Sequence, residues 1–150
     1  MPRETVQAFR DLWFHTGDAV RLGEDGSLWF VDRAAERIRR RGENVASAEV
    51  ERVLLEHPAV ADAAVVAVRA EGEGSEDEIK AVVVGTATPP EVWAWCDERL
   101  PYFAVPRYVE LVEELPKTPT AKVLKTELRE AGVGPATADR GAAAAGKGLR

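Results

Sequence analysis

Two nearly uninterrupted apolar runs limit the fold of this chain more than any other feature. Residues 61–68 read ADAAVVAV, and residues 79–84 read IKAVVV. Strands with one face in water alternate apolar and polar residues, whereas runs of this kind need cover on both faces. We therefore expect an α+β domain in which helices pack on a compact sheet of about three strands, preceded by a small N-terminal β-hairpin.

The other expected elements agree with this fold class. Asp25-Gly26, between residues 19–22 and 28–32, is a hairpin signal, and residues 107–112 read as a further strand. Segments with apolar residues on one side predict the helices, which span residues 1–13, 48–56, 91–100 and 125–130.

Two residues in these helices have simple structural interpretations. Ser47 is a good N-cap for the helix that follows it, because its hydroxyl can accept a hydrogen bond from an unpaired backbone N–H. Cys96 is the only cysteine and falls on the core side of its helix, so we expect a packed thiol. A single cysteine also excludes an internal disulfide and a CxxC metal site, and we assign no metal ligand.

The composition excludes some classes of partner. The formal net charge is −6, whereas nucleic-acid-binding domains are usually basic. No apolar run approaches the ~18 residues of a membrane-spanning helix, and no signal-peptide pattern follows Met1. We therefore expect a cytoplasmic protein with no nucleic-acid partner and no membrane span.

Residues 32–51, DRAAERIRRRGENVASAEVE, combine an Asp-Arg pair, a basic run, a Gly-Glu-Asn turn and a helix start. The basic run alone fits the solvated face of a strand. The order of the features favours something more specific, because Arg33 follows an apolar strand and Gly42 closes a turn before the helix. We interpret the stretch as a flexible joint at one end and a narrow backbone passage at the other.

Asp18 ends the segment FHTGD, residues 14–18. One interpretation is a turn residue that bonds its own backbone, a common use of aspartate. The other is a carboxylate placed to accept two neighbouring hydroxyls, as on a ribose. The local sequence leaves both open.

Lys122 lies toward the far end of PKTPTAKVLK, a loop stiffened by Pro116 and Pro119. A lysine on such a loop can reach into a site built by another surface and stabilise negative charge that develops on a carboxylate or phosphate. The alternative is an ordinary surface lysine, which composition alone favours.

Taken in order, these three segments resemble the C-terminal part of the adenylate-forming superfamily, which includes acyl-CoA synthetases, peptide-synthetase adenylation domains and firefly-type luciferases. FHTGD resembles the family's aromatic-x-Thr-Gly-Asp motif, residues 32–51 its hinge-and-turn motif, and PKTPTAKVLK the motif that carries its adenylation lysine. The resemblance covers about residues 9–129 and is closest to acyl-CoA ligases of the medium-chain fatty acid or carnitine type.

The resemblance implies a two-step ligase reaction. A carboxylate attacks the α-phosphate of Mg-ATP to give an acyl-adenylate and pyrophosphate, and the thiol of CoA then displaces AMP. Asp18 would hold the ribose hydroxyls, Arg33 would contact ribose or phosphate, and Lys122 would bridge the attacking carboxylate and the α-phosphate. ATP with Mg²⁺ and CoA would be substrates of the complete enzyme, with none bound by this chain alone.

The resemblance also implies a rotation between the two steps. The family turns its C-terminal domain about a hinge two residues after the arginine, which is Ala35 here. The turn of Arg41, Gly42 and Glu43 would then replace the lysine loop and line the pantetheine tunnel, with CoA phosphates near the basic residues. Ala35 and Ala121 depart from the family, which commonly has Asp or Lys at the hinge and Gly before the lysine.

The segments that bind adenine, the phosphates and the acyl group in this family have no counterpart here. We therefore divide the chain into a linker helix and the end of a large N-terminal domain (1–32), a mobile C-terminal domain (33–131) and a disordered tail (132–150). The large domain, covalent or in trans, and a small carboxylic acid are the expected partners. A stand-alone module that docks on or regulates a partner adenylating protein is the alternative function, and a nucleic-acid-binding domain using residues 37–41 is disfavoured by the charge.

Overall fold

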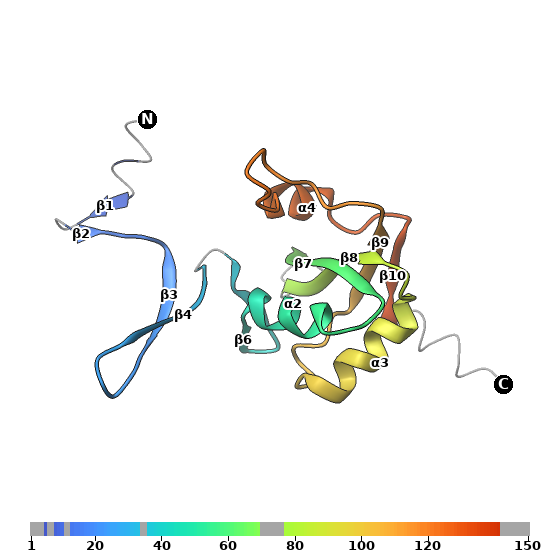
Figure 1. Cartoon of the computed structure of the whole chain (residues 1–150), viewed down its shortest axis with the longest axis horizontal. Helices are drawn as coiled ribbons and strands as arrows, with labels where there is room; N and C mark the ends of the chain where they lie inside the picture. Colours follow the sequence, from blue (N-terminus) through green and yellow to red (C-terminus); the bar gives the residue numbers. More distant parts are fainter. Residues whose placement is uncertain (1–4, 6–7, 11–12, 34–35, 70–76, 142–150) are drawn as a thin grey trace.

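The centre of the fold is a four-stranded sheet with the strand order β10-β9-β8-β7 (Figure 1). The structure is a computed structural model and describes residues 5, 8–10, 13–33, 36–69 and 77–141. The strands of this sheet are β7 (Val60–Arg69), β8 (Asp77–Gly85), β9 (Tyr108–Val112) and β10 (Thr137–Asp139). β8 and β9 run parallel, and the other two pairs are antiparallel.

Helices cover both faces of this sheet. The helices are α2 (Ser47–Leu55), α3 (Pro89–Arg99) and α4 (Lys125–Ala131). Alternate residues of β7 point to opposite faces, so Val65 packs in one apolar cluster with Val50 of α2 and Cys96 of α3. Val66 packs in a second cluster with Leu128 of α4. The α+β fold class and the two-sided cover are thus confirmed, and Cys96 is a buried thiol whose pKa is raised by burial to about 12.

The N-terminal cap of α3 follows known capping preferences, whereas the cap of α2 differs from our prediction. α3 begins with Pro89 and Pro90, and Glu91 Oε2 accepts a 2.8 Å hydrogen bond from the Thr88 backbone N–H in a capping box. The N-cap of α2 is Ala46, so the assignment of Ser47 as N-cap is wrong. Ser47 lies in the first turn, fully buried, and its hydroxyl accepts a hydrogen bond from Lys125 instead.

The sheet has one strand more than expected because β10 forms within the predicted disordered tail. Lys80, only 2% exposed, donates to the carbonyl of Gly132 and pairs with Glu110 at 2.6 Å. Thr137 donates to the same Glu110 carboxylate at 2.7 Å. A buried ammonium needs such acceptors, and one of them, the carbonyl of Gly132, belongs to the predicted tail. The disorder prediction is therefore wrong for residues 132–141, while residues 142–150 lie outside the described part.

The N-terminal segment differs from the expected helix over residues 1–13. β1 (Phe9–Arg10) pairs antiparallel with β2 (Trp13–Phe14), and the rings of Phe9 and Phe14 lie 5.1 Å apart. A helix of this length is marginal without a packing partner, which explains why the apolar side chains stack across a short ladder instead. The helix prediction is thus wrong at residues 9–10 and 13, whereas Thr5 and Ala8, the other described residues of the predicted helix, are helical.

The expected hairpin between residues 19–22 and 28–32 is confirmed as β3 (Asp18–Leu22) and β4 (Leu28–Arg33). Figure 1 shows its turn pointing away from the four-stranded sheet. No helix in the described part of the chain is both long enough and apolar enough to cross a bilayer. The division into domains at residues 32 and 131 stays a prediction.

Candidate functional site

Asp18 and Arg33 meet at the end of the hairpin that lies opposite its turn. They are direct partners in the β3–β4 ladder, and Arg33 Nη1 lies 2.9 Å from Asp18 Oδ1. Thr16 holds both, because its hydroxyl accepts from the Asp18 backbone N–H and its carbonyl accepts from Arg33 Nη1. Two residues 15 positions apart in sequence thus form one polar corner, in which Arg33 is exposed and Asp18 is partly buried.

The predicted turn at Gly42 connects β5 (Ile38–Arg40) to β6 (Glu43–Val45). Arg40 and Glu43 are partners in the ladder, so the loop has only two residues, Arg41 and Gly42. Their φ angles are +54° and +79°, and two consecutive positive φ angles are typical of a type I′ hairpin turn. A Cβ added at position 42 would meet no atom of the described chain within 4 Å. The turn therefore presents an open backbone surface.

A cleft borders this turn. It has a volume of about 450 Å³, and Arg41 and Tyr102 line it on the side of the turn. The guanidinium of Arg41 lies over the Tyr102 ring, 5.6 Å from its centre, in a cation–π arrangement. Glu43 is exposed on β6. An exposed cation beside an aromatic ring suits a ligand that carries both phosphate and a flat ring.

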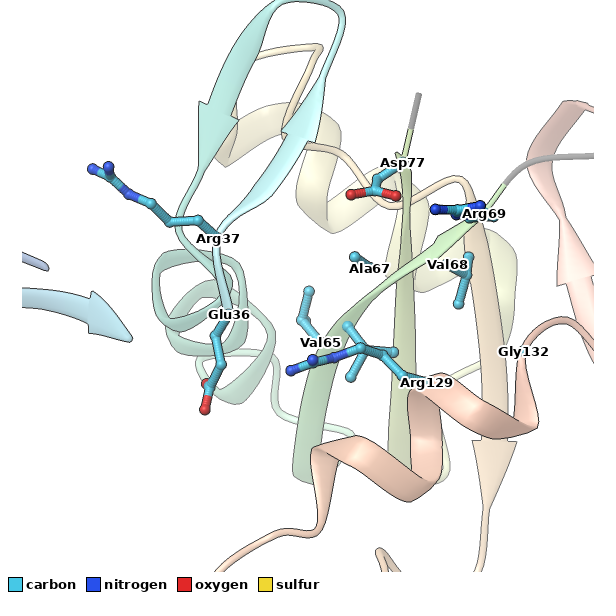
Figure 2. Close-up of a pocket in the computed structure, with 10 residues that line it drawn as sticks. Glu36, Arg37, Val65, Ala67, Val68, Arg69, Asp77, Arg129 and Gly132 are labelled. Atoms are coloured by element: carbon cyan, nitrogen blue, oxygen red, sulfur yellow. The ribbon is translucent and has the colours of Figure 1, made fainter. Parts of the chain in front are cut away.

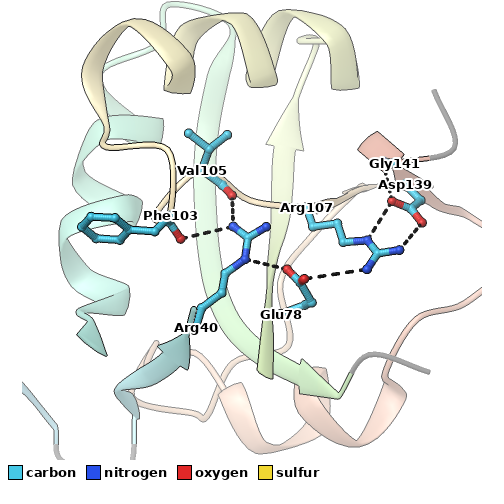
Figure 3. Close-up of polar contacts among 7 residues, drawn as sticks. All are labelled: Arg40, Glu78, Phe103, Val105, Arg107, Asp139 and Gly141. Atoms are coloured by element: carbon cyan, nitrogen blue, oxygen red, sulfur yellow. Dashed lines mark hydrogen bonds and ion pairs between the residues drawn. The ribbon is translucent and has the colours of Figure 1, made fainter. Parts of the chain in front are cut away.

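The basic run of residues 37–41 is not solvated throughout, because Arg40 is buried. Figure 3 shows its guanidinium between the carbonyls of Phe103 and Val105 and the carboxylate of Glu78. Arg40 Nη1 donates to Val105 O at 2.6 Å, and Nε lies 2.7 Å from Glu78 Oε2. Burial lowers the pKa of Arg40, and the Glu78 charge opposes that shift. Because it is buried and paired, Arg40 anchors β5 to the sheet and is not available to CoA phosphates.

The ion-pair network that holds Arg40 extends through Arg107 to Asp139 in the C-terminal segment. Arg107 Nη1 lies 3.7 Å from Glu78, and its Nε and Nη2 both bond the Asp139 carboxylate at 3.1 Å. The hydrogen bonds to Asp139 raise the pKa of Arg107. Figure 3 shows these four charged side chains in alternation, from β5 through β8 to β10. The turn at Gly42 is therefore held to the sheet by a continuous polar network.

The lysine loop is a closed, hydrogen-bonded structure. Thr118 N–H donates to Lys122 O and Leu124 N–H donates to Pro116 O, each at 2.8 Å. The Thr118 hydroxyl accepts from the Lys122 backbone N–H at 3.1 Å. Ala121, where the family commonly has glycine, has a φ of +62°. This left-handed conformation is costly for alanine, so the loop stores backbone strain directly before Lys122.

Three lysines in this region have different environments. Lys117 Nζ bonds Asp62 at 2.6 Å, and Lys125 is largely buried among acidic side chains. Lys122 is exposed, and its ammonium forms no ion pair with any residue that the structure describes. Only Lys122 is therefore placed to reach a ligand or another surface.

The predicted site residues thus form three groups. Asp18 and Arg33 share the hairpin corner, the triplet Arg41 to Glu43 shares the β5–β6 turn, and Lys122 has its own loop. Figure 1 shows the β3–β4 hairpin apart from the four-stranded sheet, near which the other two groups lie. The predicted hinge residue, Ala35, lies outside the described residues. Separate groups of this kind are suited to act on one ligand only when a further surface or a rotation brings them together.

Sequence reasoning missed Arg40 and Lys125. The signal for Arg40 was strand alternation, because Ile38 and Arg40 share one face of β5 and Ile38 is completely buried. Lys125 carried no local signal beyond its place three residues after Lys122. Its acidic partners come from distant parts of the chain.

The chain is similar to known enzymes over most of its length. Residues 49–122 match the AMP-binding enzyme C-terminal domain family. The 2-succinylbenzoate–CoA ligase of Bacillus mycoides is 40% identical over 126 residues, which cover 84% of this chain and 26% of that protein. The peroxisomal trans-cinnamate:CoA ligase of Petunia hybrida is 42% identical over 128 residues, which cover 83% of this chain and 22% of that protein.

A solved structure agrees with the sequence matches. The o-succinylbenzoate CoA synthetase of Bacillus subtilis, in complex with its acyl-adenylate intermediate, superposes on this chain with a TM-score of 0.73 at 35% sequence identity. The superposition covers 85% of this chain and 26% of that enzyme. The matched fold is thus that of the adenylate-forming enzymes. The chain belongs to the family of AMP-binding enzyme C-terminal domains and spans about a quarter of the length of the curated relatives it matches.

Proposed function

We propose that this chain acts as the C-terminal domain of an AMP-forming acyl-CoA ligase. The reaction joins a small carboxylic acid to CoA in two steps. First, a carboxylate oxygen bonds to the α-phosphorus of ATP and pyrophosphate leaves. Then the sulfur of CoA bonds to the acyl carbon and AMP leaves. The two CoA ligases similar to this chain support the reaction class, and the acid that it activates is left open.

The observation that carries the proposal is the exposed Lys122 on a closed loop. Its neighbours Lys117 and Lys125 are held by carboxylates, whereas Lys122 is exposed and has no carboxylate partner among the described residues. An ammonium between the attacking carboxylate and the α-phosphate would stabilise the charge that builds up between them. We assign this role in the first step to Lys122.

The hairpin corner suits the nucleoside part of ATP. The Asp18 carboxylate can accept from both ribose hydroxyls, and Arg33 beside it can contact ribose or phosphate. No cluster of three or more metal-ligating side chains occurs in the described part of the chain. In this proposal Mg²⁺ arrives with ATP, and we assign no residue of this chain to it.

The β5–β6 turn suits the second step. Gly42 has no side chain, and its surroundings within this domain are open, so pantetheine can pass close to the backbone. Arg41, over the Tyr102 ring, lies at the edge of the adjoining cleft and can meet a CoA phosphate. A rotation about Ala35 would exchange the lysine loop for this turn.

The exposed apolar side chains of the β3–β4 hairpin are evidence for contact with a large domain, joined covalently or docked. The large apolar side chains of the hairpin are exposed, with exposed fractions of 69% for Leu22, 58% for Trp29 and 61% for Phe30. Leu22 and Phe30 share one face of the ladder with the exposed Val20 and Leu28, and an exposed apolar face of this kind marks a contact with another protein surface. We infer that a large adenylation domain covers it, and that this chain alone is incomplete for catalysis.

The test is acyl-dependent release of pyrophosphate with ATP, Mg²⁺ and CoA over a panel of short to long carboxylic acids. The chain is assayed alone, and mixed with a related ligase that lacks its own C-terminal domain. We expect activity only in the mixture. Activity of the chain alone would overturn the claim that it is incomplete, whereas binding to the truncated ligase without turnover would favour a regulatory module.

A further inference from the structure

Lys125, three residues after Lys122, has a buried ammonium with three partners. Its Nζ lies 2.7 Å from Glu36 Oε2, 2.8 Å from Glu51 Oε1 and 2.9 Å from Ser47 Oγ. These contacts use all three N–H donors of the ammonium. The side chain of Lys125 is only 15% exposed. A cation in the first turn of α4 is disfavoured by the helix dipole, so the two carboxylates must compensate for its position.

The partners of Lys125 belong to two separate segments of the chain. Glu36 directly follows the predicted hinge residue Ala35, and Ser47 and Glu51 lie on α2. Glu51 Oε1 also accepts a 2.7 Å hydrogen bond from the Val65 N–H of β7. Lys125 therefore joins the chain that leaves the hinge to α2, to the sheet and to the end of the lysine loop.

The chain at Glu36 needs such a bond because a cleft separates it from the sheet. Figure 2 shows Glu36 and Arg37 on one side of this cleft, β7 with Val65 on the other, and Arg129 reaching from α4 into the space between them. The cleft has a volume of about 470 Å³. Apolar packing is therefore sparse at this place, and the contact of Glu36 with Lys125 bridges the two sides.

We propose that Lys125 is a positioning residue for adenylation, which fixes the loop of Lys122 to the chain leaving the hinge so that both rotate as one body. The inference rests on the proposed function. Lys125 acts through Lys122 and does not touch substrate. The closed hydrogen bonds of the loop carry the position of Lys125 to Lys122 over a short and rigid path.

The second step depends less on Lys125. The Gly42 turn is anchored separately, through Arg40 and its contacts with Glu78 and Val105. Loss of the Lys125 ammonium should therefore loosen the lysine loop and leave the turn in place. Burial opposes the charge of Lys125, but hydrogen bonds with Glu36 and Glu51 outweigh it and raise its pKa, so the ammonium persists at neutral pH.

The experiment compares Lys125→Met, Lys125→Arg and Glu36→Ala in a complete ligase that contains this chain. Arg52→Met, which removes an exposed cation of α2, is the matched control. Adenylate formation and thioester formation from pre-made acyl-adenylate are measured separately. We expect Lys125→Met and Glu36→Ala to slow adenylate formation about ten- to a hundred-fold, since misplacement of a catalytic group is costly. Thioester formation should change little, and Lys125→Arg should recover part of the rate.

Amide hydrogen exchange of this chain gives a second readout that is independent of catalysis. In Lys125→Met the amides of Lys122 and Leu124 should exchange faster, while those of β8 keep their protection. Equal loss of both half-reactions, or unchanged exchange in the loop, would overturn the positioning role. If Lys122→Ala itself leaves adenylation intact, the proposed function fails at its lysine, and the exchange result still decides whether Lys125 fixes the loop.

Discussion

Arg33 Nη1 lies 2.9 Å from Asp18 Oδ1, across the last pair of the β3–β4 ladder. The two residues assigned to the nucleotide thus hold each other in place before any ligand arrives. A carboxylate that is already oriented loses little freedom when it binds two hydroxyls.

Asp18→Asn in a complete ligase should raise the KM for ATP about ten-fold or more, because hydrogen bonds to a charged group contribute roughly 1.5–3 kcal/mol. The measurement is steady-state kinetics at varied ATP. Asp25→Asn is the matched control, since Asp25 only accepts hydrogen bonds from Ser27 in the exposed hairpin turn. An unchanged KM in the Asp18 variant would remove it from the nucleotide site.

Gly42→Leu should slow thioester formation and leave adenylate formation nearly intact. A Cβ at position 42 would meet no atom of the described chain within 4 Å, so we expect a block to come from the tunnel that the turn enters. Gly42→Ala is the control for backbone strain, because alanine has the same Cβ at a positive φ but a much smaller side chain. Normal thioester rates in the leucine variant would contradict the assignment of the turn.

Ala121→Gly should raise the free energy of unfolding by about 0.5–1 kcal/mol. At a φ of +62° the alanine Cβ is strained by roughly 1–2 kcal/mol, and this gain exceeds the entropy that glycine adds to the unfolded chain. Urea denaturation measures the effect. Ala94→Gly, on the exposed side of α3, gives the opposite sign because no strain is relieved there and glycine destabilises a helix interior. A destabilised Ala121→Gly variant would show that the loop is not strained.

Glu110→Ala should cost about 3–5 kcal/mol, because it leaves the buried Lys80 ammonium without its carboxylate. Lys80→Met should cost less, since a linear apolar side chain fills the same space. Thermal or urea denaturation of the two variants gives the comparison. Equal costs for the two substitutions would mean that the charge of Lys80 is not the reason for the loss.

The same pair sets a dependence of stability on pH. Burial opposes the ionised form of Glu110, but hydrogen bonds from Lys80 and Thr137 outweigh it and lower the pKa of the carboxyl. The folded pKa thus lies below the unfolded value of about 4.3, so the pair stabilises above that pH and loses its contribution as the pH falls through the lowered pKa. Acid unfolding should be shallower in Glu110→Gln, and an identical pH profile would contradict this origin.

Much of the fold followed from local patterns. The apolar runs of β7 and β8 predicted strands covered on both faces, and Asp25-Gly26 predicted the hairpin. These signals depend on residues close together in sequence. β10 had no such signal, because Thr137 and Asp139 are fixed by Glu110 and Arg107 across the sheet. Tertiary charge pairs of this kind decide the structure of a segment that composition assigns to disorder.

The candidate site shows the same division. Motif order identified Asp18, Gly42 and Lys122 as members of one family pattern. It gave no sign that Arg40 is buried or that Lys125 gathers carboxylates from two distant segments. Ser47 illustrates the reason, since its hydroxyl suits a helix cap locally but accepts from Lys125, 78 residues away. Long-range partners override local preference where a buried charge must be satisfied.

The most direct measurement of the central claim is the two half-reactions of Lys122→Ala in a complete ligase. The ammonium is proposed to act between carboxylate and α-phosphate, so adenylate formation should fall by about a hundred-fold or more. Thioester formation from pre-made acyl-adenylate should stay close to the wild-type rate. Equal loss of both half-reactions, or retention of both, would contradict the role of Lys122 and with it the proposed division of the two steps.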